Sequence, residues 1–153
     1  MVHALEEIQR LLKPNGCLID IHPVREAPLI KVYRGSSVQF VESDPGYDYD
    51  ESIQQAEAAL TQIIQRGLFV IKGKDEFDLT TYASSVAELR EFFAMVGAYD
   101  DDPKDDAMEA QRTALYARVE EIMQAAGGEA EIAYHERAHI TRLNPNVRKE
   151  ELI

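Results

Sequence analysis

The chain has 153 residues, one cysteine, and 28 acidic against 16 basic side chains, which gives a formal net charge of −12. A length of this order predicts a single domain, residues 1–153, that folds without the help of disulfides. The acidic balance argues against binding to nucleic acid and to anionic membrane surfaces, because both depend on clustered basic groups.

No apolar stretch approaches the roughly 20 residues that span a bilayer. The N-terminal stretch MVHALEEIQRLLK has the pattern of an amphipathic helix and not that of a signal peptide. We therefore expect a soluble, cytoplasmic protein without a membrane partner.

The first predicted element is a helix over roughly 2–12, where apolar side chains recur at helical spacing. Pro14 and Gly16 end this helix, because proline cannot continue it and glycine permits a tight reversal. The run CLIDIHPV then predicts a strand over 17–22. Since apolar and polar residues do not alternate cleanly in it, we expect this strand to be buried on both faces, as strands with parallel neighbours are.

Two hairpins and a helix are predicted next. Residues 29–42 have the pattern of a hairpin, with a turn that contains Gly35. The helix that follows reaches about Arg66, and Gly67 is suited to end it. The stretches LFVIK, GKDE and FDLTTY, residues 68–82, predict a second hairpin that turns at GKDE.

Two further helices complete the helical part of the chain. Ser85 and Glu88 form a capping-box pattern that opens a helix through about Ala98. A charged linker separates it from a long helix over about 105–126. Helices and hairpins in this order predict an α+β fold with a mixed, mainly antiparallel sheet of about six strands and about four helices.

The last element, 130–143, contains the stretch HERAH, which fits the H-E-x-x-H pattern of zinc peptidases. That pattern binds zinc on a helix, where side chains four residues apart lie about 5–6 Å from one another. On a strand the same two histidines, His135 and His139, lie roughly 13 Å apart and cannot share an ion. Polarity and β-branched residues favour a strand, although a helical stripe also fits. Pro145 stands where the longer motif has a third histidine, so we predict no metal site.

The stretch ALEEIQRLLKPNGCLIDIHPV, residues 4–24, is the most specific feature of the sequence. It resembles the helix–turn–strand found late in class I S-adenosylmethionine-dependent methyltransferases, which reads R-x-L-K-P-x-G before an apolar strand. Asn15 stands where the family usually has a second glycine. The resemblance implies a fold like the C-terminal half of a Rossmann-like methyltransferase. The matching residues are Arg10, Leu12, Lys13, Pro14 and Gly16.

In that family the cofactor lies on a glycine-rich loop upstream of the matched helix. None of the eight glycines of this chain forms G-x-G. The resemblance therefore implies a stand-alone domain without a cofactor or catalytic residues of its own. The open edge of strand 17–22 then favours a homodimer or a partner chain. The alternative is a methyltransferase that uses S-adenosylmethionine and whose N-terminal half is on another chain or is missing.

His22 and Arg25 are the candidate ligand contacts, because they follow the strand on the side where the resemblance implies an active site. His22 is suited to act as a donor or a base, and Arg25 to hold an anion. A strand-end histidine and a solvated arginine are the more common explanation for such a pair. Acidic residues crowd the loop that contains Asp44 and Asp48, and we interpret this loop as solvated, because its spacing does not match a calcium loop.

Overall fold

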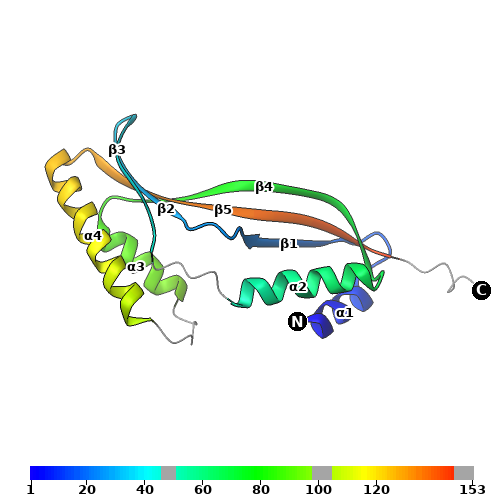
Figure 1. The fold of residues 1–153 in the computed structure, drawn as a ribbon. Helices are drawn as coiled ribbons and strands as arrows, with labels where there is room; N and C mark the ends of the chain where they lie inside the picture. The colour runs from blue at the N-terminus through cyan, green and yellow to red at the C-terminus, as the bar shows by residue number, and fades with distance from the viewer. Residues whose placement is uncertain (46–50, 98–104, 147–153) are drawn as a thin grey trace, which may run out of the picture. The chain divides into compact units, whose positions relative to one another are not determined.

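The computed structural model describes residues 1–45, 51–97 and 105–146 (Figure 1). These residues form an α+β fold with four helices and an open, mainly antiparallel sheet of five strands. The helices are α1 (Val2–Leu11), α2 (Glu51–Gln65), α3 (Val86–Val96) and α4 (Asp106–Ala126). The strands are β1 (Leu18–Pro23), β2 (Leu29–Arg34), β3 (Ser37–Ser43), β4 (Phe69–Ala83) and β5 (Ala130–Pro145).

Contacts between residues divide the chain into two compact units. Unit 1 combines Met1–Arg25, Tyr49–Phe77 and Arg137–Ile153, and unit 2 combines Glu26–Asp48 and Asp78–Glu136. β4 and β5 each contribute residues to both units. The expectation of a single domain stays a prediction.

Unit 1 contains the helix and strand predicted at the N-terminus. α1 and α2 pack against each other (Figure 1). Their apolar faces meet the strands in a small core, where aliphatic side chains surround one phenylalanine. The buried members of this core are Leu5, Ala59, Ile63, Phe69 and Leu143.

The expectation that β1 is buried on both faces is wrong. β1 pairs antiparallel with the end of β5, in a register that sets Leu18 opposite Leu143. Leu18 is partly buried, whereas Ile19 and Ile21 are 46% and 56% exposed. The apolar side chains of β1 therefore lie on both faces of the sheet, but only one of these faces is packed.

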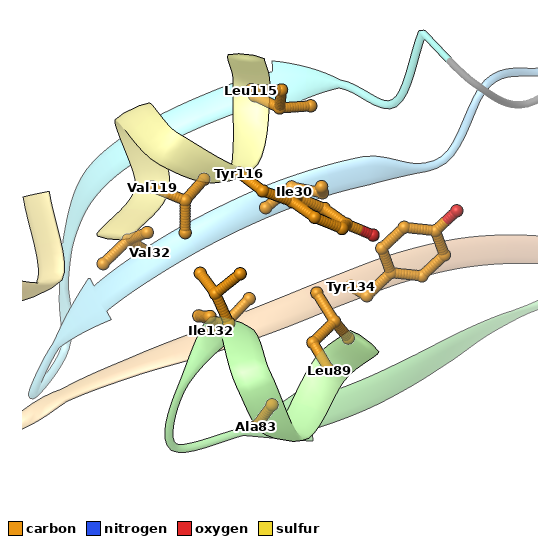
Figure 2. Close-up of a cluster of buried hydrophobic side chains, with 10 residues drawn as sticks. Ile30, Val32, Ala83, Leu89, Leu115, Tyr116, Val119, Ile132 and Tyr134 are labelled. Atoms are coloured by element: carbon orange, nitrogen blue, oxygen red, sulfur yellow. The ribbon is translucent and has the colours of Figure 1, made fainter. Parts of the chain in front are cut away.

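Unit 2 is built on the predicted hairpin of β2 and β3, which pair antiparallel around Gly35. Gly35 has a φ of 57°, a left-handed conformation that favours glycine. β2 also pairs antiparallel with the first part of β5. Figure 2 shows how side chains of α3 and α4 converge on β2 and β5. The labelled core comprises Ile30, Val32, Ala83, Leu89, Leu115, Tyr116, Val119, Ile132 and Tyr134.

The predicted start of α3 is confirmed with Ser85 as its N-cap, but the reciprocal bond of a full capping box goes to Ser84 instead of Ser85. Ser85 Oγ accepts a hydrogen bond of 3.1 Å from the backbone N–H of Glu88. The Glu88 carboxylate in turn accepts from the hydroxyl and the backbone N–H of Ser84, each at 2.7 Å. These two hydrogen bonds lower the pKa of Glu88, because they stabilise its charged form.

The second predicted hairpin, residues 68–82, does not form. β4 runs as one strand from Phe69 to Ala83, so the sheet has five strands and not six. A tight hairpin turn needs positive φ, and Gly73 is not among the described glycines with that conformation. Glu76, in the expected turn, instead forms an ion pair with Arg137 of β5.

The buried side chains of β5 do not keep to one parity along the strand. In unit 2 Ile132 and Tyr134 are buried in the core, and the intervening Ala133 is buried as well. In unit 1 Ala138, Thr141 and Leu143 are buried, whereas Arg142 is exposed. A single alternating pattern therefore does not describe this strand.

None of the helices that the structure describes combines the length and the apolarity that a bilayer crossing requires.

Candidate functional site

Two histidines and a glutamate meet in unit 1. The register of β1 and β5 sets His22 directly opposite His139, and their ring centroids lie 5.4 Å apart. Glu57 reaches the same place from α2. One ligand atom from each of these three side chains lies within 4.8 Å of the other two. We call this group the His–Glu cluster.

The surroundings of His22 orient its ring. Nδ1 lies 2.7 Å from Oδ2 of Asp20, two residues earlier on the same strand. When Nδ1 carries the proton and donates it to Asp20, Nε2 is left with a lone pair. Nε2 lies 3.7 Å from Oε1 of Glu57. In that tautomer the ring presents an acceptor to the cluster.

His139 has a similar carboxylate neighbour. Its Nδ1 lies 3.3 Å from Oε1 of Glu76, but this buried nitrogen forms no hydrogen bond of suitable geometry. The side chains of His22 and His139 are 14% and 18% exposed. Both rings are thus largely shielded from water.

Two arginines complete the surroundings of the cluster. Arg25 donates to Oε2 of Glu57, and Arg137 donates to Oε2 of Glu76. In each carboxylate the other oxygen, Oε1, is the one near a histidine. The arginines therefore hold the two carboxylates in place while one oxygen of each stays close to an imidazole.

The structure thus brings both sequence-predicted residues, His22 and Arg25, to Glu57. A role for either in contacting a ligand stays a prediction. Glu57 and His139 were missed as their partners. In the sequence Glu57 has the pattern of a solvent-facing residue on a helix. His139 stands out only as part of the H-E-x-x-H stretch together with His135.

The expectation of a strand over 130–143 is confirmed by β5. His135 lies in unit 2, where its Nδ1 is 3.0 Å from Thr80 Oγ1. Burial, and next the charge of Lys31, lower the pKa of His135. The two histidines of the H-E-x-x-H pattern therefore have different neighbours and do not form a zinc-peptidase site.

A second polar group lies in unit 2 and is buried. Asp44 is 2% exposed, so its interpretation as part of a solvated loop is wrong. Its carboxylate accepts a 2.9 Å hydrogen bond from the Tyr134 hydroxyl and a 3.1 Å hydrogen bond from Arg112 Nε. Burial, and next the charge of Asp44, raise the pKa of Tyr134, which keeps this hydroxyl a donor. We call these three residues the Asp44 network.

β1 also presents a free edge. In the part of the chain that the structure describes, β5 is the strand that pairs with β1, and β1 stands at the end of the strand order β1-β5-β2-β3. The exposed Ile19 and Ile21 lie on this edge strand. Backbone groups at such an edge are open to pairing with another chain.

Comparisons of the chain with protein-family models, with curated proteins and with solved structures found no match.

Proposed function

We propose that this chain acts by association and not by catalysis, and that two copies join at their β1 edges as a homodimer. The observation that supports this proposal is the edge of β1, which lacks a second strand neighbour within the described residues and carries the exposed Ile19 and Ile21. Pairing of two identical edges around a two-fold axis satisfies both sets of backbone groups at once.

An antiparallel pairing of two β1 strands brings their isoleucines together. Directly opposite residues share one face of a sheet. Pairing centred on Asp20 sets Ile19 of one copy against Ile21 of the other, which gathers four isoleucines on one face. Covering these half-exposed side chains contributes about 1 kcal/mol each. The loss of translational and rotational freedom on association costs at least about 4 kcal/mol. The backbone hydrogen bonds between the two β1 strands are therefore also needed, and we expect a micromolar Kd.

β3 stands at the other end of the strand order but is a poorer edge. Its pairing with β2 carries a register shift between Val32 and Tyr33, and such irregularities disrupt an edge for further pairing. Val38 on β3 is 49% exposed, similar to Ile19 and Ile21. It therefore offers a matched control position.

Sedimentation equilibrium tests this proposal. We expect a monomer–dimer equilibrium with a Kd of about 1–100 μM, and a shift to monomer in the Ile21→Lys variant, because a buried lysine at the edge is strongly unfavourable. Val38→Lys leaves the equilibrium unchanged. Added salt strengthens the dimer, because it screens the repulsion between two chains of formal charge −12. A wild-type chain that stays monomeric at about 100 μM, or a dimer lost equally in both variants, contradicts the proposal.

A second candidate function is that of a methyltransferase completed by an N-terminal half. It is favoured by the geometry of the turn that the family resemblance covers. Gly16 N–H donates to the carbonyl of Lys13 at 2.8 Å, and a Cβ at Gly16 would lie 3.0 Å from Leu12 Cδ2 and from the Lys13 carbonyl oxygen. The turn therefore favours glycine at the position that the family motif requires. Calorimetric titration of the chain with S-adenosylmethionine bears on the first proposal, since a Kd below about 100 μM, roughly −5.5 kcal/mol, contradicts association without catalysis.

A further inference from the structure

The His–Glu cluster is not used by the proposed association. We propose that His22, Glu57 and His139 form a zinc site, in which two imidazole nitrogens and one carboxylate oxygen converge from β1, β5 and α2. The site is complete within one chain, so it stands independently of the dimer.

The distances suit a tetrahedral ion after a small adjustment. Zinc–nitrogen and zinc–oxygen bonds of about 2.0–2.2 Å place neighbouring ligand atoms of a tetrahedron roughly 3.3 Å apart. The three ligand atoms here lie within 4.8 Å of one another. We expect rotation of the imidazole and carboxylate groups about their own side-chain bonds to close this gap.

The positions of the ligands are fixed by regular structure. His22 and His139 form a cross-strand pair, the arrangement in which Cβ atoms are about 4.5–5.5 Å apart. Glu57 is on α2, whose Ala59 and Ile63 are buried in the core of unit 1. Three ligands on two paired strands and a packed helix are held more firmly than ligands on loops.

The polar neighbours match what zinc-bound histidines require. A histidine that binds zinc through one nitrogen usually donates its other N–H to a carboxylate or carbonyl. Asp20 is placed to accept from Nδ1 of His22, at 2.7 Å. Glu76 Oε1 lies 3.3 Å from Nδ1 of His139, a nitrogen that is buried without a hydrogen bond.

The charges around the cluster also favour a cation. Asp20, Glu57 and Glu76 carry three carboxylates, against the two guanidinium groups of Arg25 and Arg137. With neutral imidazoles the group retains an excess of negative charge. Arg25 holds Oε2 of Glu57, which leaves Oε1 toward His22 as the ligand oxygen.

The ligand set favours zinc over calcium or magnesium. Imidazole nitrogens suit zinc and its neighbours in the transition series, whereas calcium and magnesium select oxygen ligands. Two histidines and one glutamate make three protein ligands. Such a set leaves a fourth position for water or for another donor.

Calorimetric titration of the chelator-stripped chain with zinc chloride tests the proposal. An excess of about 5 mM magnesium in the buffer occupies sites made only of carboxylates. We expect one zinc ion per chain at every protein concentration. In His22→Gln, His139→Gln and Glu57→Gln we expect the affinity to fall roughly 100-fold or more, because a ligand itself is removed. Asp20→Asn, which alters an orienting neighbour, is expected to weaken binding about 10-fold.

His135→Gln is the matched control, because it removes the other histidine of the H-E-x-x-H stretch on the same strand. This variant is expected to bind zinc as the wild type does. Far-UV circular dichroism in the presence of chelator checks that each variant is folded. If a histidine variant unfolds, Glu57→Gln still tests the site, because Glu57 lies on a partly exposed face of its helix. Absence of zinc binding at about 100 μM, or equal losses in His135→Gln and His139→Gln, overturns the proposal.

Discussion

The two units each contain a group of polar side chains around a carboxylate, but the groups differ in how fully they are paired. In the Asp44 network of unit 2, a carboxylate that is 2% exposed accepts from a tyrosine hydroxyl and from an arginine. In the His–Glu cluster of unit 1, the imidazoles are partly exposed and one buried ring nitrogen forms no hydrogen bond. The first group is suited to stabilise the fold, and the second to accept a ligand.

The difference follows from the partners that each unit supplies. Tyr134 and Arg112 both donate to Asp44, so each oxygen of this buried carboxylate has a hydrogen-bond partner. Histidine is both donor and acceptor, so a pair of facing imidazoles next to carboxylates retains lone pairs. Buried polar groups are usually paired, and an unpaired one suggests a site that acts on something outside the chain.

The largest expected effect is the loss of Asp44. Asp44→Ala leaves the Tyr134 hydroxyl and part of Arg112 without their acceptor in a buried place, which costs about 3–4 kcal/mol of unfolding free energy. Chemical denaturation measures this loss. Glu42→Ala is the control, because Glu42 lies two residues earlier on β3 and pairs with Arg118 of α4 in an exposed setting. We expect it to cost less than about 1 kcal/mol, and equal costs for the two variants contradict the assignment of Asp44 as a buried structural anchor.

The next effect concerns the response of the two units to zinc. A ligand present at 100 times its Kd stabilises the folded state by about 2.7 kcal/mol. Hydrogen exchange read by mass spectrometry is expected to show added protection in β1 and α2 of unit 1, which carry His22 and Glu57. The amides of α4, in unit 2, serve as the internal reference. Protection that does not rise in β1 and α2 shows that zinc does not act through the His–Glu cluster.

A smaller effect is expected from Glu57→Gln in the absence of metal. Glu57 pairs with Arg25 in a partly exposed setting, and such ion pairs contribute up to about 1 kcal/mol. We therefore expect a small loss of stability in chelator and a large loss of zinc affinity. A thermal melt of the variant with and without zinc separates these two quantities. A stability loss comparable to that of Asp44→Ala makes Glu57 a structural residue.

The smallest expected effect is a gain in stability, in the Glu136→Gln variant. Burial, and next the charge of Asp44, raise the pKa of Glu136 above its ordinary value of 4.5. The folded state therefore binds the proton of Glu136 more tightly than the unfolded state does. The stabilisation that comes from this proton is present in acid and is lost as the pH rises through the pKa of Glu136 in the folded state. Glu136→Gln removes that loss, and we expect a gain in stability at pH 7 of less than about 1 kcal/mol and no gain near pH 4. A variant that is less stable at pH 7 contradicts the assigned direction of the pKa shift.

Local patterns predicted the helices well, because their signals lie within a few residues of one another. Ser85 and Glu88 predicted the start of α3, and the long helix over 105–126 was found as α4. The hairpin at Gly35 was also predicted, since the turn needs a left-handed residue there. Residues 68–82 were predicted wrongly, because a charged stretch that begins with Gly73 resembles a turn whether or not the chain reverses.

The candidate site could be predicted only in part. His22 and Arg25 stood out by their place after a strand, but their neighbours Glu57 and His139 are 35 and 117 residues from His22 along the chain. Nothing local to β1 specifies that its partner is the last strand or fixes the register that pairs His22 with His139. Strand pairing of this range is set by the packing of whole elements.

The two ladders that β5 forms, with β2 and with β1, make the length of this strand as important as its composition. The β2 ladder fixes Tyr134 opposite Ile30, and the β1 ladder fixes His139 opposite His22. Deletion of one residue between these two points would turn one half of the strand over, exchanging core side chains for exposed ones. We therefore expect deletion of one residue between the two ladders to be more disruptive than replacement of an exposed residue in the same stretch.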